Sequence, residues 1–396
     1  MATYGLGREL KFFLVKTTTT ADALNNYGTS SQVALTGTAN AAKVTSSSMD
    51  FTVARENRMD ARASRSVLER ITGKQEISWS VEAYMLPRGS SDVPNIGPMI
   101  ECAMGSVSTV TYSLADTLPT LQMARVLPGV LREDCFGAYV EEMTVTASGA
   151  DPIKLSFSGG AMEYALTGTG TTGTGATSVT MPVGTNEGFN FMPGSKIQLV
   201  GLTAAAGTVV KGSTAHNSVT LAASTAFGSS VAITPHVPQG DYATHGNPTS
   251  GITGTVSVNA DTGLQVTGFD LTLTNNIKAL SDEYGSKGTN DFIPGFRTVT
   301  GQVTVRCTAE DLKALTRRYQ TAGPSITDGV PTFATVAIIL TMGQTADKKQ
   351  LITLPTCELD FAGIDIPESE EAILSIPFTA LGASGGDEFT FEWNNG

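Results

Sequence analysis

The acidic clusters are the residues of this chain whose type and spacing come closest to catalytic chemistry. Glu141 and Glu142 are adjacent, and Glu368, Glu370 and Glu371 lie within one four-residue stretch. Two neighbouring carboxylates can act as general acid and general base when their surroundings separate their pKa values. Both clusters fall on expected strand edges and turns, with no partner pocket indicated. We therefore interpret them as solvated charge and expect no enzyme activity.

Metal and phosphate sites are not indicated either. His216, His236 and His245 lie 20 and 9 residues apart in a loop-rich region, and we interpret them as exposed or hydrogen-bonding side chains. The glycine-rich run at 168–175 lacks the Lys of a phosphate-binding loop, so we interpret it as a flexible linker. We expect no cofactor and no metal ion.

The cysteines do not form a recognisable pattern. No two of the four are spaced as a C-x-x-C pair, and no histidine is adjacent to any of them. We expect buried free thiols rather than disulfides. They are Cys102, Cys135, Cys307 and Cys357.

Arginines gather in a polar stretch at 56–73 that has no alternating apolar pattern. We interpret this stretch as a long exposed loop or arm. Acidic residues alternate with the arginines and no aromatic residue accompanies them, which favours salt bridges to another subunit or ring over nucleic-acid binding. The arm residues are Arg58, Arg62, Arg65 and Arg70. A second long connection at 275–294 carries Lys278, Asp282 and Glu283.

The composition excludes several classes of protein. Only 16% of the 396 residues are charged, against roughly 25% in ordinary soluble domains. The net charge is −12, and residues 249–396 carry 18 acids against 9 bases. Such a balance argues against tight phosphate binding. No run approaches the roughly 20 apolar residues of a membrane span, and the first ten residues lack the apolar core of a signal peptide, so we expect folding in a cytoplasm and no membrane partner.

A strand–connection–strand pattern occurs twice. Phe51 begins the triplet Phe-Thr-Val 22 residues before the strand at 73–81, and Leu271 begins the triplet Leu-Thr-Leu 24 residues before the strand at 295–303. Alternating apolar residues at 49–55 and 77–83 predict half-buried strands. The chain therefore has the pattern of one β-rich unit used twice.

Helices and further strands complete each expected unit. Residues 98–104 predict a short helix with Pro98 in its first turn, and residues 309–319 predict a capped amphipathic helix. Residues 139–146 and 153–159 predict a closing hairpin.

Three regions follow from these patterns. The first unit covers residues 1–165 and the second covers residues 249–396. Between them, residues 166–248 contain only four charges, all three histidines and several short strand patterns. We expect a small all-β insert domain there.

The order of strand, arm, return strand, helix and hairpin resembles the tail tube proteins of long-tailed, siphovirus-type bacteriophages. The residues that carry this likeness are 51–58, 73–81 and 96–105, and the insert's residues 191–201 are similar to small β modules of phage tails. The resemblance implies a mainly β fold with two tandem tail-tube-type units, each a β-sandwich or barrel with a flanking helix. It also implies that sheets of neighbouring subunits join edge to edge.

The resemblance further implies a location and partners. The chain would form homotrimeric, pseudo-hexameric rings that stack into a virion tail tube, with assembly in the bacterial cytoplasm. Its partners would be itself and the tape measure, tail terminator and distal tail proteins, and phage DNA would pass through without sticking. Because an acidic bore repels phosphates, we expect lumen-facing carboxylates at Glu141, Glu142, Glu358 and Asp360.

Other functions stay open at this point. The Gly/Thr-rich insert and the low charge are also typical of a β-sandwich adhesin or carbohydrate-binding virion protein, and a capsid decoration protein has a similar composition. Glycan binding by a monomer would distinguish the first of these from a tube subunit.

Overall fold

A computed structural model describes most of the chain. The described residues are 9–17, 27, 29, 32–57, 70–87, 94–149, 151–199, 208–239, 247–251, 254–258, 264–306, 325–327, 330–332, 335–343, 349–360, 364–365 and 373–393. Over these residues the fold is mainly β, as the sequence predicted. The predicted helix at 309–319 lies outside them, as does Cys307.

The first half of the chain supplies ten strands and two short helices. Its strands are β1 (Lys11–Thr17), β2 (Ala41–Ala42), β3 (Ser46–Asn57), β4 (Arg70–Tyr84), β5 (Gly105–Ser108), β6 (Thr111–Leu114), β7 (Thr120–Leu127), β8 (Leu131–Ser148), β9 (Lys154–Gly160) and β10 (Glu163–Thr167). Its helices are α2 (Gly37–Asn40) and α3 (Gly97–Met104).

The C-terminal half supplies the other strands of the main sheet and two separate hairpins. The sheet strands are β17 (Thr255–Val258), β18 (Val266–Thr274), β21 (Thr298–Arg306), β24 (Val336–Met342), β25 (Gln350–Leu359), β26 (Ile364–Asp365), β27 (Ile373–Ala380) and β28 (Thr390–Glu392). The hairpins are β19 (Lys278–Leu280) with β20 (Asp291–Ile293), and β22 (Ser325–Thr327) with β23 (Val330–Thr332).

The two halves share a pattern of strand pairing. In the first half, β1 pairs with β7, β3 with β4, β4 with β9, and β8 with β7, β9 and β10. In the second half, β17 pairs with β24, β18 with β21, β21 with β27, and β25 with β24, β27 and β28. Every one of these twelve pairings is antiparallel. The six strand pairings of the first half therefore recur in the second half, between strands that follow one another in the same order along the chain.

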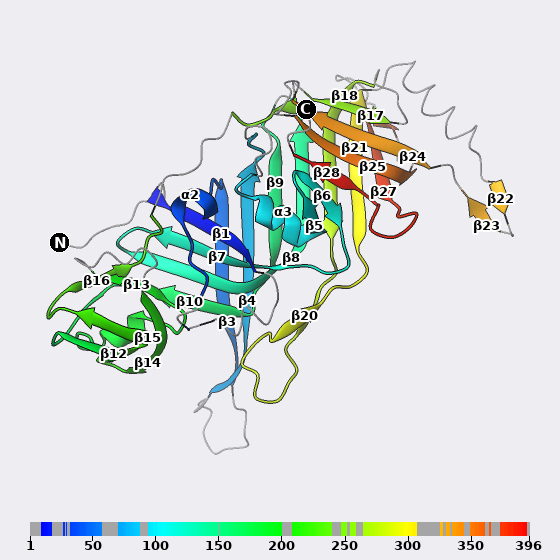
Figure 1. The fold of residues 1–396 in the computed structure, drawn as a ribbon. Helices are drawn as coiled ribbons and strands as arrows, with labels where there is room; N and C mark the ends of the chain where they lie inside the picture. Colours follow the sequence, from blue (N-terminus) through cyan, green and yellow to red (C-terminus); the bar gives the residue numbers. More distant parts are fainter. Residues whose placement is uncertain are drawn as a thin grey trace.

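One long strand connects the halves. The first part of β8 pairs with β7 and β10, whereas Glu142–Ser148 pairs with β18. As a result, eight strands form one continuous sheet in the order β3, β4, β9, β8, β18, β21, β27, β25 (Figure 1). We call it the eight-stranded sheet.

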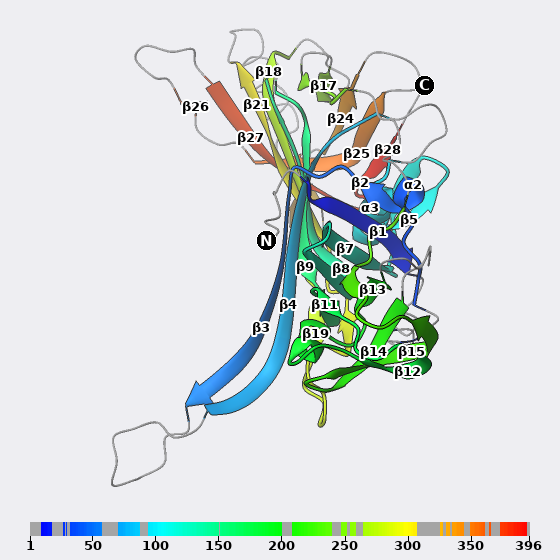
Figure 2. The same ribbon diagram turned by 90° about the vertical axis from the view of Figure 1, so that its left-hand side faces the viewer.

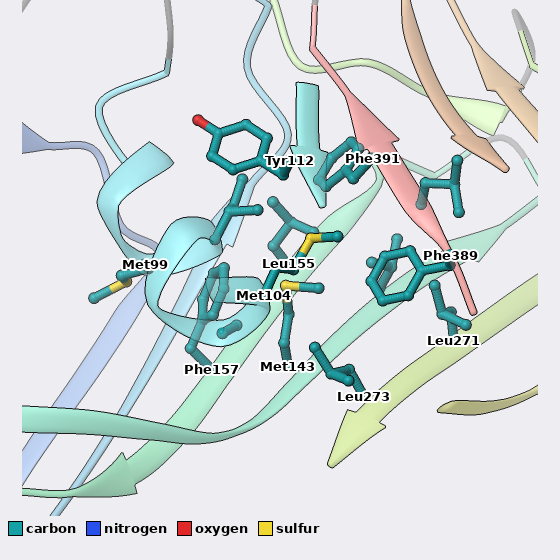
Figure 3. Packing of buried hydrophobic residues seen from close by; sticks show 14 of the residues in the cluster. Met99, Met104, Tyr112, Met143, Leu155, Phe157, Leu271, Leu273, Phe389 and Phe391 are labelled. Carbon is teal, nitrogen blue, oxygen red and sulfur yellow. The ribbon is translucent and has the colours of Figure 1, made fainter. Parts of the chain in front are cut away.

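The hydrophobic core runs across this junction. Alternation places Ile77, Trp79 and Val81 on the buried face of β4, as predicted. Met143 on β8 lies opposite Leu273 on β18, and both side chains are buried in one cluster (Figure 3). Because core residues of both halves are removed from water together, the junction strengthens both halves.

The predicted helix at 98–104 is confirmed as α3, which starts at Gly97 with Pro98 in its first turn and ends at Gly105 in the left-handed conformation. It covers the apolar face of the eight-stranded sheet beside β8 (Figure 3). Its buried residues include Met99, Ile100 and Met104.

A separate six-stranded sheet lies between the halves in sequence. It contains β11 (Gly170–Thr171), β12 (Ala176–Pro182), β13 (Lys196–Leu199), β14 (Thr208–Ala215), β15 (Ser218–Phe227) and β16 (Ala232–Pro235), with the 3-10 helix η2 (Glu187–Asn190). Ten buried apolar residues form its own core. In Figure 2 this sheet, α3, β1 and β7 all lie on the same side of the eight-stranded sheet.

The glycine run at 168–175 is not the flexible linker that we expected. Gly170 and Thr171 pair with β16, and the backbone N–H of Gly173 donates to Pro182 O at 2.8 Å. A Cβ atom at Gly173 would lie 2.9 Å from Pro182 Cβ. The glycines here allow close approach of strands rather than chain mobility.

The arms also differ from the expected loops. Within the stretch 56–73, β3 continues to Asn57 and β4 begins at Arg70, and these two residues pair. Both faces of this end of the ribbon are exposed, so burial imposes no apolar alternation. In the second connection, β19 and β20 form a hairpin. Both ribbons project from the same end of the sheet (Figures 1 and 2).

Candidate assembly surface

The eight-stranded sheet has one apolar face and one polar face. Successive strand residues alternate between them, and the polar face is covered by neither α3 nor another sheet (Figure 2). We define this polar face as the first residue, and every second residue after it, in each of the following ranges: 46–52, 76–84, 142–148, 154–158, 268–274, 298–306, 358–360 and 373–379. One row of paired residues crosses all eight strands. It consists of Ser46, Glu82, Ser156, Thr144, Thr272, Thr300, Thr379 and Glu358.

Every member of that row is a hydroxyl or a carboxylate. Short hydroxyl side chains leave the surface flat, and they hydrogen-bond water or each other. For example, Thr144 Oγ1 and Thr272 Oγ1 lie 3.5 Å apart across the junction of the halves, and Ser48 Oγ and Ser80 Oγ lie 2.8 Å apart. No apolar patch interrupts the row. The row itself presents neither a cation nor an apolar side chain to a solute.

Carboxylates dominate the charge of the polar face. The described acids on it are Asp50, Glu76, Glu82, Glu142, Asp270, Glu358 and Asp360, and the bases are Lys154 and Arg306. Lys154 Nζ lies 2.7 Å from Glu82 Oε1, and this hydrogen bond raises the pKa of Lys154. The face therefore carries net negative charge at neutral pH.

Three of the four predicted lumen acids lie on this face. Glu142 is paired with Ser158 and Thr274, and Glu358 is paired with Thr379. Asp360 follows β25 and its N–H donates to Pro377 O at 2.9 Å. Glu141 differs, because it is the extra residue of a β-bulge between Val140 and Glu142. The bulge takes it out of the strand alternation that places the other three acids on the polar face.

The outer strands of this sheet have open edges in the described part of the chain. β3 pairs with no strand other than β4, and on its outer edge Ser47 O accepts a 2.8 Å hydrogen bond from Arg125 Nη1. At the far end, Glu358 and Leu359 pair with β27 alone, and β26 continues along β27. Open edges of this length invite further strands unless something covers them.

A buried asparagine fixes the junction between the halves. Asn275, directly after β18, donates its backbone N–H to Glu141 O at 2.8 Å. Its side-chain Nδ2 donates to Ala103 O and Val140 O, each at 3.0 Å. The side chain thereby satisfies the end of α3 and the β8 bulge together. Sequence reasoning missed this role because Asn at the start of a connection is typical of an ordinary turn.

The predicted arm residues are only partly described. Arg58, Arg62 and Arg65 lie outside the described residues. Arg70 is exposed at the start of β4. Lys278 is exposed in β19.

The two arms contact each other at their bases. Lys74 Nζ lies 3.0 Å from Asp282 Oδ1, and this contact lowers the pKa of Asp282. The backbone N–H of Gln75 donates to Lys287 O at 2.7 Å. Glu283 accepts a 2.7 Å hydrogen bond from Asn290. The carboxylate of Asp282, one of the predicted arm residues, is therefore paired within the chain.

A buried polar cluster attaches the six-stranded sheet to the first half. Arg132 and Asp134 on β8 form a bidentate ion pair with distances of 2.6 and 2.7 Å, and both side chains are fully buried. Arg132 also donates to His236 O at 2.9 Å. Lys196 on β13 donates to Val33 O at 2.6 Å, and burial lowers its pKa to about 8.

This cluster shows one structural connection that the sequence did not indicate. His236 was expected to be exposed or hydrogen-bonding, and it is buried and hydrogen-bonded, with its Nδ1 3.3 Å from Arg132 Nη1. The only sequence signal was two opposite charges at alternate positions of a strand, which is ambiguous because exposed strand faces have the same pattern.

The described part of the chain holds no group of three or more His, Cys, Asp or Glu side chains that would suit a metal ion. Cys102, Cys135 and Cys357 are free and buried, and burial raises the pKa of Cys357 to about 12. Within the same residues, no helix is long and apolar enough to cross a membrane.

The sequence matches no protein-family model and no curated protein sequence. The assembly surface is therefore interpreted from its own geometry.

Proposed function

We propose that this chain is a structural tube subunit. Three copies would form a ring by joining their eight-stranded sheets edge to edge, and rings would stack into a tube with the polar face lining the bore. The resemblance to phage tail tube proteins supports this function, and it adds DNA as the solute that passes and other tail proteins as partners at the tube ends.

The observation that carries the proposal is the β8–β18 junction. There, the last strand of the first four-stranded set pairs with the first strand of the second set. The outermost strands of the whole sheet are the corresponding strands, β3 at one end and β25 with β26 at the other. A second copy of the chain can repeat between β25–β26 and its own β3 the contact that β8 makes with β18. Repetition around a closed ring leaves no open edge.

The bulges of the two halves give the register of that contact. The β7–β8 pair has a bulge between Leu121 and Met123 of β7. The β24–β25 pair has the corresponding bulge between Val336 and Ile338 of β24. Matching these bulges, and leaving the extra residue Glu141 out of the count, makes Asp360 the counterpart of Glu142. Following the paired residues across the next strands makes Thr52 the counterpart of Thr274. Because Glu142 lies opposite Thr274, the proposal places Asp360 opposite Thr52 of the next chain.

This register allows a disulfide test. The Asn275 N–H bonds to Glu141 O, so the adjacent Glu142–Thr274 pair is non-hydrogen-bonded, with an expected Cα separation of about 4.5 Å. That spacing suits a disulfide. Oxidation of the double variant Thr52→Cys with Asp360→Cys is expected to give covalently closed trimers on a non-reducing gel.

The controls separate register from chance collision. Either single substitution supplies only one of the two cysteines. The double variant Ser46→Cys with Asp360→Cys keeps both cysteines on the same face but out of register. All three variants are expected to give little cross-linking. Native mass measurement of the unmodified protein is expected to show three chains per ring. A stable monomer, or six chains per ring, would contradict the proposal.

A further inference from the structure

An exposed aromatic side chain and a pocket lined by both apolar side chains and backbone polar groups lie at opposite ends of one strand. Tyr284, in the loop between β19 and β20, is fully exposed. The pocket lies beside the first residues of β18, next to the end of β8 and the start of β17. Since β18 has 9 residues and the hairpin follows its other end, pocket and tyrosine are separated by about 30 Å or more. Figures 1 and 2 show the hairpin and the pocket's strands at opposite ends of the sheet.

The pocket has the size and lining for an aromatic ring. Its volume is about 140 Å³, and an apolar cavity of about 150 Å³ is large enough to bind benzene. Four glycines also line it and present backbone polar groups, which suit a phenol hydroxyl better than a plain phenyl ring. The apolar lining includes Ala147, Ile153, Val256, Val266, Phe269 and Met342.

Hydrogen bonds in the loop order the backbone on both sides of Tyr284. Ser286 N–H donates to Glu283 O at 3.2 Å, and Asn290 Nδ2 donates to Glu283 Oε2 at 2.7 Å. The hairpin is further attached to β4 through Lys74 and Gln75. An anchor that is ordered before binding loses less conformational entropy when it binds.

We infer that Tyr284 of one chain inserts into this pocket of a second copy of the chain, in the adjacent ring. Donor and receptor lie on different surfaces of the same molecule, so the contact is head to tail and does not close. Repetition therefore generates a stack of rings. The inference rests on the proposed function for the ring itself, and it adds the residue and the pocket that join one ring to the next.

Two variants test the contact from its two sides. Tyr284→Ala removes the anchor, and Thr255→Trp places a ring at the exposed mouth of the pocket. Each is expected to leave trimers intact and to raise the protein concentration needed for tubes about tenfold or more, since burial of one aromatic side chain is lost at each contact. Phe189→Ala, at another exposed aromatic on η2, is the matched control and is expected to stack normally. Normal tubes from Tyr284→Ala would overturn the inference.

Cross-linking of mixed variants tests the head-to-tail geometry. Protein with Tyr284→Cys and protein with Thr255→Cys are oxidised separately and together, at a protein concentration high enough for Tyr284→Ala to form tubes, with the unsubstituted chain as the cysteine control. Dimers are expected from the mixture alone. Efficient dimers from Tyr284→Cys by itself would indicate a two-fold contact and overturn the inference, as would an unreactive mixture. Native mass measurement separates failure of the ring from failure of the stacking contact. Loss of trimers contradicts the proposed ring, whereas trimers that do not cross-link contradict only the stacking contact.

Discussion

Arg132 and Asp134 show how a charge can be structural in this chain. Each side chain is fully buried, and each is satisfied by the other. Removing one partner of a buried pair leaves an uncompensated charge, which costs about 3–5 kcal/mol. Asp134→Asn is therefore expected to lower the free energy of unfolding by about that amount in urea titration. The exposed pair Glu82–Lys154 is the control, and Glu82→Gln is expected to cost less than about 1 kcal/mol. Equal effects of the two substitutions would contradict this interpretation.

Lys196 gives this region a distinct pH dependence. Burial, with Arg132 nearby, lowers its pKa to about 8 in the folded chain, whereas an unfolded lysine titrates near 10.4. Between those values the unfolded chain binds more protons, so the free energy of unfolding rises with pH from about 8 to about 10. Lys196→Met is expected to remove about 1–3 kcal/mol of that rise.

The measurement compares urea unfolding at pH 7.5 and pH 10. Lys211→Met, at an exposed position of β14, is the matched control and is expected to keep the rise. An unchanged pH difference in Lys196→Met would count against a buried amine with a lowered pKa.

The sequence predicted which charged side chains are exposed better than it predicted which are buried. Glu142, Glu358 and Asp360 lie on the polar face because strand alternation fixes the side on which a residue points. Glu141 is the extra residue of a bulge in β8, which depends on the pairing with β9 and has no signature in β8 itself, so its expected place in a lumen stays a prediction. The buried pair of Arg132 and Asp134 is a further example, since its partners lie on strands distant in sequence.

At the scale of elements, local pattern predicted the strands well and their extent less well. The alternation of Met49, Phe51 and Val53 is confirmed in β3. The same strand continues beyond its apolar residues to Asn57, because a two-stranded ribbon is held by backbone hydrogen bonds whatever its side chains. Periodicity detects burial, and it does not detect ribbons exposed on both faces.

The ends of β3 and β4 suggest a role for the arm beyond them. Residues 58–69 connect strands whose last pairs are solvent-exposed and contribute nothing to the core. Deleting residues 58–69 and closing the ribbon with Asn-Gly, a sequence suited to a two-residue hairpin turn, is expected to leave circular dichroism and the unfolding midpoint unchanged. Because the arm is proposed to contact an adjacent subunit or ring, the same variant is expected to stop polymerisation.

Shortening the other hairpin provides the comparison. Replacing residues 281–290 with a two-residue turn removes Asp282 and Tyr284 together, so it should reduce stacking while trimers persist. If the 58–69 deletion gives tubes of normal length, the arm has no role in assembly.

At the scale of the whole molecule, the eight-stranded sheet separates two chemistries. Apolar residues, α3 and the six-stranded sheet lie on one side, and hydroxyls and carboxylates lie on the other (Figure 2). Sequence reasoning reached the acidic surplus of residues 249–396 but not the continuous row of hydroxyls. That row depends on the register of seven strand pairs, and register is set by tertiary contacts.

An acidic, hydroxyl-lined bore is expected to let DNA slide because it gives phosphates no cations to bind. The triple variant Glu142→Lys, Glu358→Lys and Asp360→Lys reverses three charges on the polar face of each chain. Assembled tubes of this variant are expected to retain short duplex DNA in sedimentation at 50 mM salt and to release it steeply by 300 mM, as counterion release requires. Unmodified tubes are expected to retain none at either concentration. Glu9→Lys with Asp116→Lys, at exposed positions outside the sheet, controls for added positive charge in general. DNA retention by unmodified tubes, or equal retention by the control, would show that the polar face does not line the path of DNA, even if the ring and its three chains are confirmed.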